Sequence, residues 1–243
     1  MRQVVRMLGA LLVSGGALAA DPLAVAPIIK AGDVWTYRST TQKGPSGWNQ
    51  TRDDTAVTRV TATSIYFTVK PSGSSQAPKE LFSGIDWSRA RDVNGKDTVV
   101  NRPLSFPLTT GKAWEIHYIE QHPNKAHRSE DITSKYAVVG YEAVEVPAGR
   151  FNAIKIEAEG QWIAQAEPTQ TVVQGAQSNA AGTVMTTETQ KTSDATTSGR
   201  TYKAFWYVPE VGRWVKSVEE YYGSGGVRNE RYTSELESYT RAP

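Results

Sequence analysis

Apolar and polar residues alternate with a period of two along most of this chain. The clearest case is residues 113–120, where Trp114, Ile116 and Tyr118 would share one face of an extended strand and Glu115 and His117 the other. No stretch after residue 20 sustains the 3.6-residue apolar period of an amphipathic helix, and β-branched and aromatic residues fill most apolar positions. The pattern therefore predicts an all-β protein.

Turn-forming residues divide the chain into short segments. The strands expected between these turns are residues 34–37, 56–63, 65–70, 113–120, 132–139, 141–146, 154–162, 202–207 and 214–216. Residues 81–97 are the least regular region. They contain an Asn94-Gly95 turn signal and could hold one short helix.

The sequence Val146-Pro147-Ala148-Gly149 predicts a hairpin turn. Proline supplies the backbone angle needed early in a type I turn, and Gly149 can adopt the positive φ of a bulged loop. The residues expected to face the core on either side of this turn are Val144, Val146, Ile154 and Ile156.

About ten strands joined by short turns indicate a single antiparallel meander, folded as a curved sheet, a sandwich or a partial barrel. We expect one all-β domain over residues 21–243. Residues 163–200 form an insertion rich in Thr, Gln, Ala and Ser. Two β-favouring runs at residues 169–173 and 183–187 favour a projecting polar hairpin, and the composition leaves a disordered loop as the alternative.

Residues 1–20 have the layout of a secretory signal peptide. Arg2 and Arg6 precede an apolar run, and Ala17-Leu18-Ala19 offers a small-x-small cleavage site. The run is shorter than the roughly 20 residues of a membrane-spanning helix. The chain contains no cysteine, so neither a disulfide nor a lipidated cysteine is available. We therefore expect a periplasmic or secreted protein with no stable membrane anchor after signal cleavage.

The charge balance excludes one class of partner. The whole chain has 27 basic and 25 acidic residues, and removal of Arg2 and Arg6 with the signal peptide leaves 25 of each. Proteins that bind nucleic acid usually carry a basic surface excess, which a balanced chain does not provide. We expect no nucleic-acid partner.

Four short motifs occur in order along the chain: Gly32-Asp33-x-Trp35-x-Tyr37, Phe106-Pro107-Leu108 with Gly111-Lys112-x-Trp114, Val146-Pro147-Ala148-Gly149-x-Phe151, and Trp206-Tyr207-x-Pro209-x-x-Gly212. Together they resemble a group of exported bacterial β proteins of unknown function, similar to the TapB-like family. The resemblance covers most of residues 30–160 and 201–240, and the segment between Trp162 and Arg200 departs from it. It implies an envelope-located β domain and supplies no catalytic residues.

All three histidines, His117, His122 and His127, fall within eleven residues. A turn at Pro123-Asn124 would place His117 and His127 on neighbouring strands, where Glu115 or Glu120 could add an oxygen ligand for zinc or copper. The spacing matches no known metal motif, and a hairpin tip is usually solvated. Ordinary surface histidines are therefore the favoured interpretation, and we expect no metal site and no cofactor.

Other catalytic patterns are missing from the sequence. It has no Gly-x-Ser-x-Gly motif in the mature chain, no thiol, no phosphate loop and no dinucleotide fingerprint, and nothing pairs its carboxylates across a cleft. We therefore assign no catalytic residue. Most of the seven tryptophans sit in strand patterns and are expected in the core. Trp48 differs because it lies among polar loop residues, which makes it a possible ligand contact.

The favoured function is a non-catalytic binding or envelope-assembly module for a lipid, glycan or protein of the cell envelope. The alternative is a hydrolase or metal-dependent enzyme that uses the region around His117 and His127.

Overall fold

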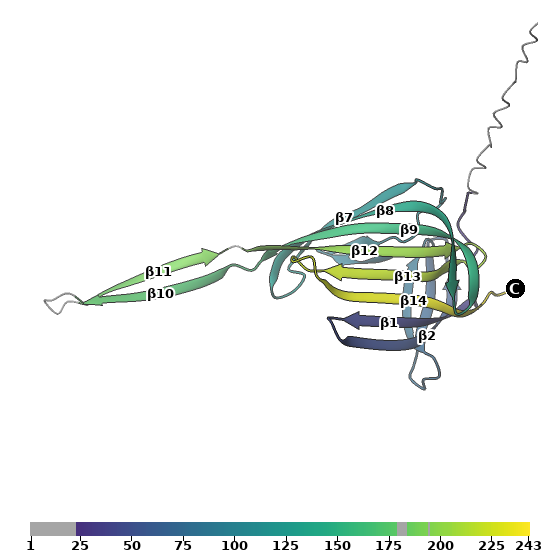
Figure 1. Ribbon diagram of the computed structural model, residues 1–243, viewed down its shortest axis with the longest axis horizontal. Coiled ribbons are helices and arrows are strands. Elements are labelled where there is room, and N and C mark those ends of the chain that lie inside the picture. The colour runs from purple at the N-terminus through teal and green to yellow at the C-terminus, as the bar shows by residue number, and fades with distance from the viewer. Residues whose placement is uncertain (1–22, 179–183, 194) are drawn as a thin grey trace, which may run out of the picture.

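The structure, a computed structural model, describes residues 23–178, 184–193 and 195–243 (Figure 1). The predicted signal peptide, residues 1–20, lies outside the described residues. No helix in the described part of the chain has the length and apolar character needed to cross a bilayer.

Ten antiparallel strands of the described chain form one large sheet. In spatial order they are β4 (Lys79–Gly84), β3 (Ser64–Pro71), β2 (Gly47–Val60), β1 (Val34–Lys43), β14 (Arg228–Thr240), β13 (Arg213–Tyr222), β12 (Thr196–Val208), β9 (Gly149–Ala166), β8 (His127–Val146) and β7 (Ala113–Gln121). Consecutive strands form two meanders, and pairing of β1 with β14 joins them. This confirms the predicted all-β antiparallel class with a curved sheet.

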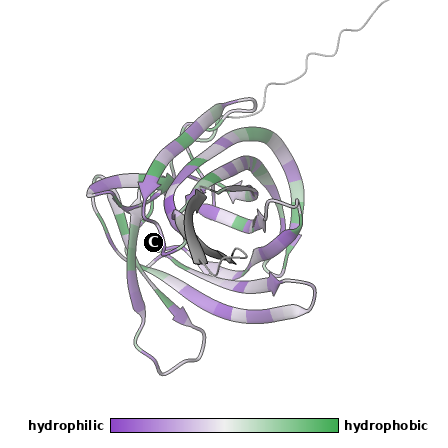
Figure 2. Cartoon of the chain, turned by 90° about the vertical axis from the view of Figure 1, so that its left-hand side faces the viewer, coloured by the Kyte–Doolittle hydropathy of each residue, from purple (hydrophilic) through white to green (hydrophobic). Residues whose placement is uncertain are grey.

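The sheet curls strongly about its strand direction, as the view along the strands shows (Figure 2). Strands β5 (Arg89–Val93) and β6 (Lys96–Asn101) form a separate two-stranded hairpin. This hairpin lies against the concave face of the large sheet. Its turn is Asn94-Gly95, with φ of 55° and 80°, as the turn signal there predicted. The least regular region of the sequence therefore consists of strands and turns instead of a helix.

The core lies between the concave face and the segments that cover it. Leu104 and Leu108 belong to the covering segment that links β6 to β7, and both are fully buried. Lys112 holds this segment, because its ammonium group donates hydrogen bonds to Ser105 O at 2.5 Å and Pro107 O at 2.9 Å. The Gly111-Lys112 motif thus has a structural role. The largest fully buried side chains of the core are Trp35, Tyr136, Tyr207, Phe205, Ile65, Leu104, Leu108, Ile154, Ile156 and Leu236.

Two tryptophans hold the turn between β12 and β13. Trp35 donates its indole N–H to Val211 O at 2.9 Å, and Trp87 donates to Gly212 O at 3.1 Å. Both indoles are buried, so each needs a hydrogen-bond acceptor inside the protein. The Gly32–Tyr37 motif and the turn before Gly212 therefore come together through these bonds, although they lie far apart in sequence.

The inserted segment forms a projecting hairpin. Strands β10 (Thr169–Ser178) and β11 (Val184–Ser193) pair with each other over their full length and extend away from the body of the protein (Figure 1). The insertion is narrower than the predicted residues 163–200, because β9 continues to Ala166 and β12 begins at Thr196. Composition could not predict this boundary, because the paired ends of β9 and β12 contain many of the same small and polar residues as the insertion.

Two local predictions need correction. Gly149 has the expected positive φ, 129°, but Val146 pairs directly with Gly149. The register shifts of the β8–β9 pair lie at His127/Ser129 and Val138/Gly140 instead of at the turn. The sequence also predicts a last hairpin that turns at residues 223–226, with Glu219 and Glu220 on its outer face opposite Arg228 and Arg231. Glu220 does pair with Arg228 and Arg231 there, whereas Glu219 faces inward, 3.5 Å from Lys203.

Candidate functional site

The concave face of the sheet changes from apolar to polar along the strands. On β12 the inward positions run from the fully buried Phe205 to Lys203 and Thr201, and on β13 from Ser217 to Glu219 and Tyr221. Lys203 marks the change. Its side chain is only 12% exposed, and it contacts Glu219 and donates to Asn101 Oδ1 at 3.1 Å. Beyond Lys203, charged, hydroxyl and amide groups lie beside aromatic rings on the concave face, and we call this part its polar half.

A cavity of about 400 Å³ occupies this polar half; we call it the inner cavity. Its walls come from five strands of the sheet, β7, β8, β9, β12 and β13, and from the β5–β6 hairpin. The lining residues are Arg89, Arg91, Val100, Tyr118, His127, Glu130, Ile132, Ser134, Gln161, Trp162, Thr201, Lys203 and Tyr221. Small-molecule pockets typically have volumes of roughly 300–1,000 Å³, so this cavity is large enough for a small ligand.

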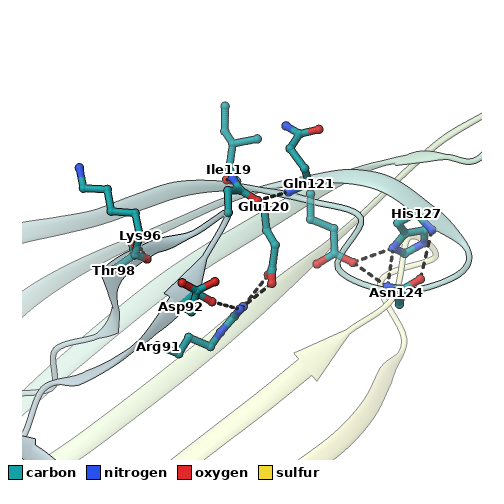
Figure 3. Close-up of polar contacts among 11 residues, drawn as sticks. Arg91, Asp92, Lys96, Thr98, Ile119, Glu120, Gln121, Asn124 and His127 are labelled. Atoms are coloured by element: carbon teal, nitrogen blue, oxygen red, sulfur yellow. Dashed lines mark hydrogen bonds and ion pairs between the residues drawn. The ribbon is translucent and has the colours of Figure 1, made fainter.

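The β5–β6 hairpin forms one wall of the inner cavity, and its turn is fixed to the edge strand β7. Asn94 donates its side-chain amide to Ile119 O and accepts from the backbone N–H of Gln121, both at 2.8 Å. The side chain thus pairs with the exposed edge of β7 as a neighbouring strand would. Arg91 adds a bidentate ion pair to Glu120, with both contacts at 2.5 Å (Figure 3).

Aromatic side chains form much of the remaining surface. Trp162 lies over the backbone of Gly199 on the paired strand, where a Cβ atom would approach the indole to 2.6 Å. Glycine is therefore required for the indole to occupy this place. The imidazole of His127 stacks on the indole of Trp162 with ring centroids 6.3 Å apart. Tyr118 and Tyr221 add phenol rings from β7 and β13.

Polar partners hold the acidic residues around the cavity. Glu130 contacts His127 Nδ1 at 2.6 Å and Asn124 Nδ2 at 3.3 Å (Figure 3 shows Asn124 and His127). The Arg91 guanidinium group, by hydrogen bonding, holds the pKa of Glu120 below its usual value. Burial raises the pKa of Tyr118 and of Tyr221, because the charged phenolate is disfavoured away from water. Both phenols are therefore neutral hydrogen-bonding groups at pH 7.

A larger trough of about 810 Å³ lies on the outer face. Its lining residues include Glu115, Lys135, Glu159 and Arg200, which alternate along the strands with inward-facing ones. Oppositely charged side chains are interspersed across the trough, and it lacks a covering wall comparable to the β5–β6 hairpin. The inner cavity is therefore the better candidate for a ligand site.

The structure separates the histidines that the sequence grouped. His117 and His127 do lie on neighbouring strands, but His117 alternates with the buried Ile116 and faces outward, 2.9 Å from Asp131. His122 contacts Glu167 at 2.9 Å, and His127 lines the inner cavity. Across the described residues, no group of three His, Cys, Asp or Glu side chains is arranged to hold a metal ion. The expectation of no metal site and no cofactor stays a prediction.

Trp48 lies at the tip of the β1–β2 hairpin, as the second residue of β2 and opposite Gln42. It is therefore a strand residue instead of a loop residue. The residue is 67% exposed and is not among the residues that line the inner cavity; β1 and β14 separate its strand from β13. Its role as a ligand contact stays a prediction.

Sequence reasoning missed the residues that line the inner cavity, among them Arg89, Trp162, Lys203 and Tyr221. The alternation pattern carried a partial signal, since Tyr118 shares a predicted face with Trp114 and Ile116. Polar residues at the inward positions of β12 and β13 also indicated a polar surface inside the sheet. The sequence did not show that these residues lie beside Trp162, because the pairing register of β12 with β9 and β13 was not known from it.

Neither a known protein family nor a curated protein matches the chain. Three solved structures are similar in part. A candidate lipoprotein from Parabacteroides distasonis is 13% identical, with a TM-score of 0.44, over 90% of this chain and 100% of the other. A candidate exported protein with a YmcC-like fold from Bacteroides fragilis is 15% identical, with a TM-score of 0.42 and the same coverage. The hypothetical lipoprotein YmcC from Escherichia coli is 12% identical, with a TM-score of 0.31, over 86% of this chain and 85% of the other.

At these scores and identities the three structures carry no argument about the function of this chain. The resemblance to the TapB-like family stays a prediction.

Proposed function

We propose that this protein is an exported, non-catalytic binding protein that holds a ligand in the inner cavity. The observation that supports this most is the polar half of the concave face, which the β5–β6 hairpin walls off without filling. A core-only role would favour apolar side chains at these inward positions. Aromatic rings beside hydroxyl, amide and charged groups are typical of a ligand site.

A binding role is favoured over a catalytic one by how the acidic residues are engaged. Glu120 is paired with Arg91, Glu219 with Lys203, and Glu130 with His127. A general acid or base must be available to the substrate, and each of these carboxylates already has a partner. The enzyme alternative also needs His117 and His127 to act together, and they face opposite sides of the sheet.

The direct test is native mass spectrometry of the protein purified from its own cell envelope. We expect a bound small molecule in the wild type and its loss in Thr201→Trp, which places an indole in the inner cavity. Ser198→Trp is the matched control, because Ser198 is an exposed residue of the same strand that does not line this cavity. A ligand retained equally by both variants would contradict the proposed site.

Export has its own test. Cleavage after Ala19 or Ala20 would give a mature protein that begins at Ala20 or Asp21. N-terminal sequencing of protein from the envelope or medium should find one of these residues. An intact Met1 in that fraction would contradict signal cleavage.

A further inference from the structure

We propose that the inner cavity binds an acidic sugar, a pyranose ring that carries a carboxylate or a phosphate, with Arg89 as the anion contact. This proposal rests on the proposed function, since it requires that the cavity is a binding site. It adds the chemical class of the ligand and the residue that selects it.

Arg89 differs from the other two cations of the cavity. Arg91 is held by Glu120 in a bidentate ion pair, and Lys203 is held by Glu219 and Asn101. Arg89 has no hydrogen bond or ion pair with any side chain in the described part of the chain, although it lines the cavity. Its guanidinium group therefore retains its full set of N–H donors for a ligand.

Arg89 is an exposed residue of β5 that lines the cavity together with Tyr118 of β7 and Tyr221 of β13. Its charge acts on the phenols of Tyr118, Tyr136 and Tyr221, which come from three different strands. In each case burial raises the pKa of the phenol, and the nearby Arg89 charge lowers it to a smaller extent. Because Arg89 lines the cavity and is exposed, an entering anion can reach its guanidinium group.

Arg89 is the charged lining residue that has no ion-pair partner in the described part of the chain. The acids Glu120, Glu130 and Glu219 are engaged by Arg91, His127 and Lys203 respectively. After these pairs are counted, Arg89 remains as the unpaired charge among the lining residues. A guanidinium fork binds carboxylate and phosphate groups in a bidentate manner, which makes either anion a suitable partner.

The rest of the lining favours a sugar ring over an acyl chain. Val100 and Ile132 are the aliphatic residues among the lining set, too few to cover a long hydrocarbon chain. Trp162, Tyr118 and Tyr221 offer rings for the C–H faces of a pyranose, and Ser134, Gln161 and Thr201 offer groups that can bond its hydroxyls. A single ring with its anionic group fits the cavity volume of about 400 Å³.

Such a ligand has two sources with the same chemistry: a free acidic monosaccharide, or one unit of an acidic polysaccharide. Isothermal titration calorimetry with glucuronic acid, glucose 6-phosphate, glucose, an acidic oligosaccharide and inorganic phosphate separates them. We expect an acidic sugar to bind about tenfold more tightly than glucose, as one charge-assisted contact would give. A still tighter acidic oligosaccharide would identify the polymer as the source.

Three variants assign the effect to Arg89. We expect Arg89→Gln to abolish the preference for acidic sugars and Arg89→Lys to keep part of it, because lysine retains the charge without the fork. Lys96→Gln is the matched control, an exposed cation of the same hairpin that does not line the cavity. It should bind as the wild type does.

The possible failures are distinguishable. Equal binding of acidic and neutral sugars, with no effect of Arg89→Gln, would overturn the acidic ligand and leave the binding function standing. If inorganic phosphate binds as tightly as the acidic sugars and displaces them completely, the sugar ring contributes nothing to binding, and the assignment to a sugar is wrong. If none of these probes binds while native mass spectrometry finds a ligand of another class, the sugar assignment is wrong. If no ligand is found by either method, the proposed function fails as well.

Discussion

Arg213 places its guanidinium group over the indole of Trp87, with the guanidinium carbon 4.3 Å from the ring centroid. Four further rings lie within 6.0 Å of the same carbon, those of Trp214, Tyr37, Trp35 and Phe67. Arg213 as a residue is partly exposed, but its Nε and Nη1 atoms are fully buried and make no hydrogen bond with the described residues. Burial lowers the pKa of this arginine. The fold therefore contains a desolvated cation that is stabilised by π faces instead of a carboxylate.

We predict that volume matters more than charge at this position. Arg213→Met keeps an unbranched side chain among the rings and removes the cost of burying unpaired N–H groups, so its free energy of unfolding should stay within about 1 kcal/mol of the wild type. Arg213→Ala should lose about 2–5 kcal/mol, because it leaves a cavity between the rings. Urea denaturation followed by tryptophan fluorescence measures both. Equal destabilisation by Met and Ala would show that the cation itself is required.

We predict a loss of stability in alkali that begins near pH 10. Burial raises the pKa of Tyr37 and of Tyr136 to about 12, whereas an unfolded tyrosine has a pKa of about 10. The folded state therefore keeps its phenolic protons longer. The stability that these groups contribute is complete below about pH 10 and is lost as the pH rises toward 12, by about 2–3 kcal/mol for each group.

The measurement is urea denaturation at several pH values, with tyrosinate absorbance recorded in parallel. Tyr37→Phe should make the alkaline decline shallower, although loss of the 2.6 Å hydrogen bond to Trp214 O lowers stability at neutral pH. Tyr239→Phe, at an exposed residue, is the control and should leave the pH profile unchanged. A wild-type stability that does not change between about pH 9 and pH 12 would contradict the prediction.

Gly149→Val should destabilise the β8–β9 hairpin through the backbone alone. The φ of Gly149 is 129°, a conformation that a β-branched residue resists at a cost of about 1–2 kcal/mol. A Cβ atom there would meet nothing within 4 Å, so steric clash is not the cause. Gly225→Val is the control, because Gly225 is equally open and its φ is outside the left-handed region. Equal melting temperatures for the two variants would contradict this account.

The projecting hairpin should be dispensable for folding. Replacement of residues 167–195 by a short Gly-Ser link joins Ala166 to Thr196 at the point where β9 and β12 separate. Stability depends weakly on loop length, by about 0.6 kcal/mol per doubling, so we expect near-native melting by circular dichroism. Loss of an envelope partner in this variant would assign the hairpin an assembly role through edge pairing.

A longer deletion, of residues 163–200, is the matched comparison. It removes the paired ends of β9 and β12, including the fully buried Ala164, and should lower the melting temperature clearly. If the shorter deletion unfolds the protein to the same extent, the projecting hairpin is part of the folding unit and our boundary is wrong.

The sequence by itself determined the local structure of this protein. Alternating residues such as Trp114, Ile116 and Tyr118 specify a strand and its buried face, and the Asn94-Gly95 pair and Gly149 specify turns that need a positive φ. These features depend on neighbours within a few residues. For that reason the all-β class, the hairpins and the inward position of Tyr118 were predictable.

Only the tertiary structure decided where the inner cavity lies and which residues line it. Arg89, Trp162, Lys203 and Tyr221 come from four strands, and the register of the pairs Gly199–Trp162 and Lys203–Glu219 brings them to one concave surface. The curl of the sheet and the side-chain bonds of Asn94 then place Arg89 opposite those strands. These contacts form only when segments that are distant in sequence pair with each other. The free energy of that pairing depends on both segments, so it cannot be predicted from the local pattern of either one.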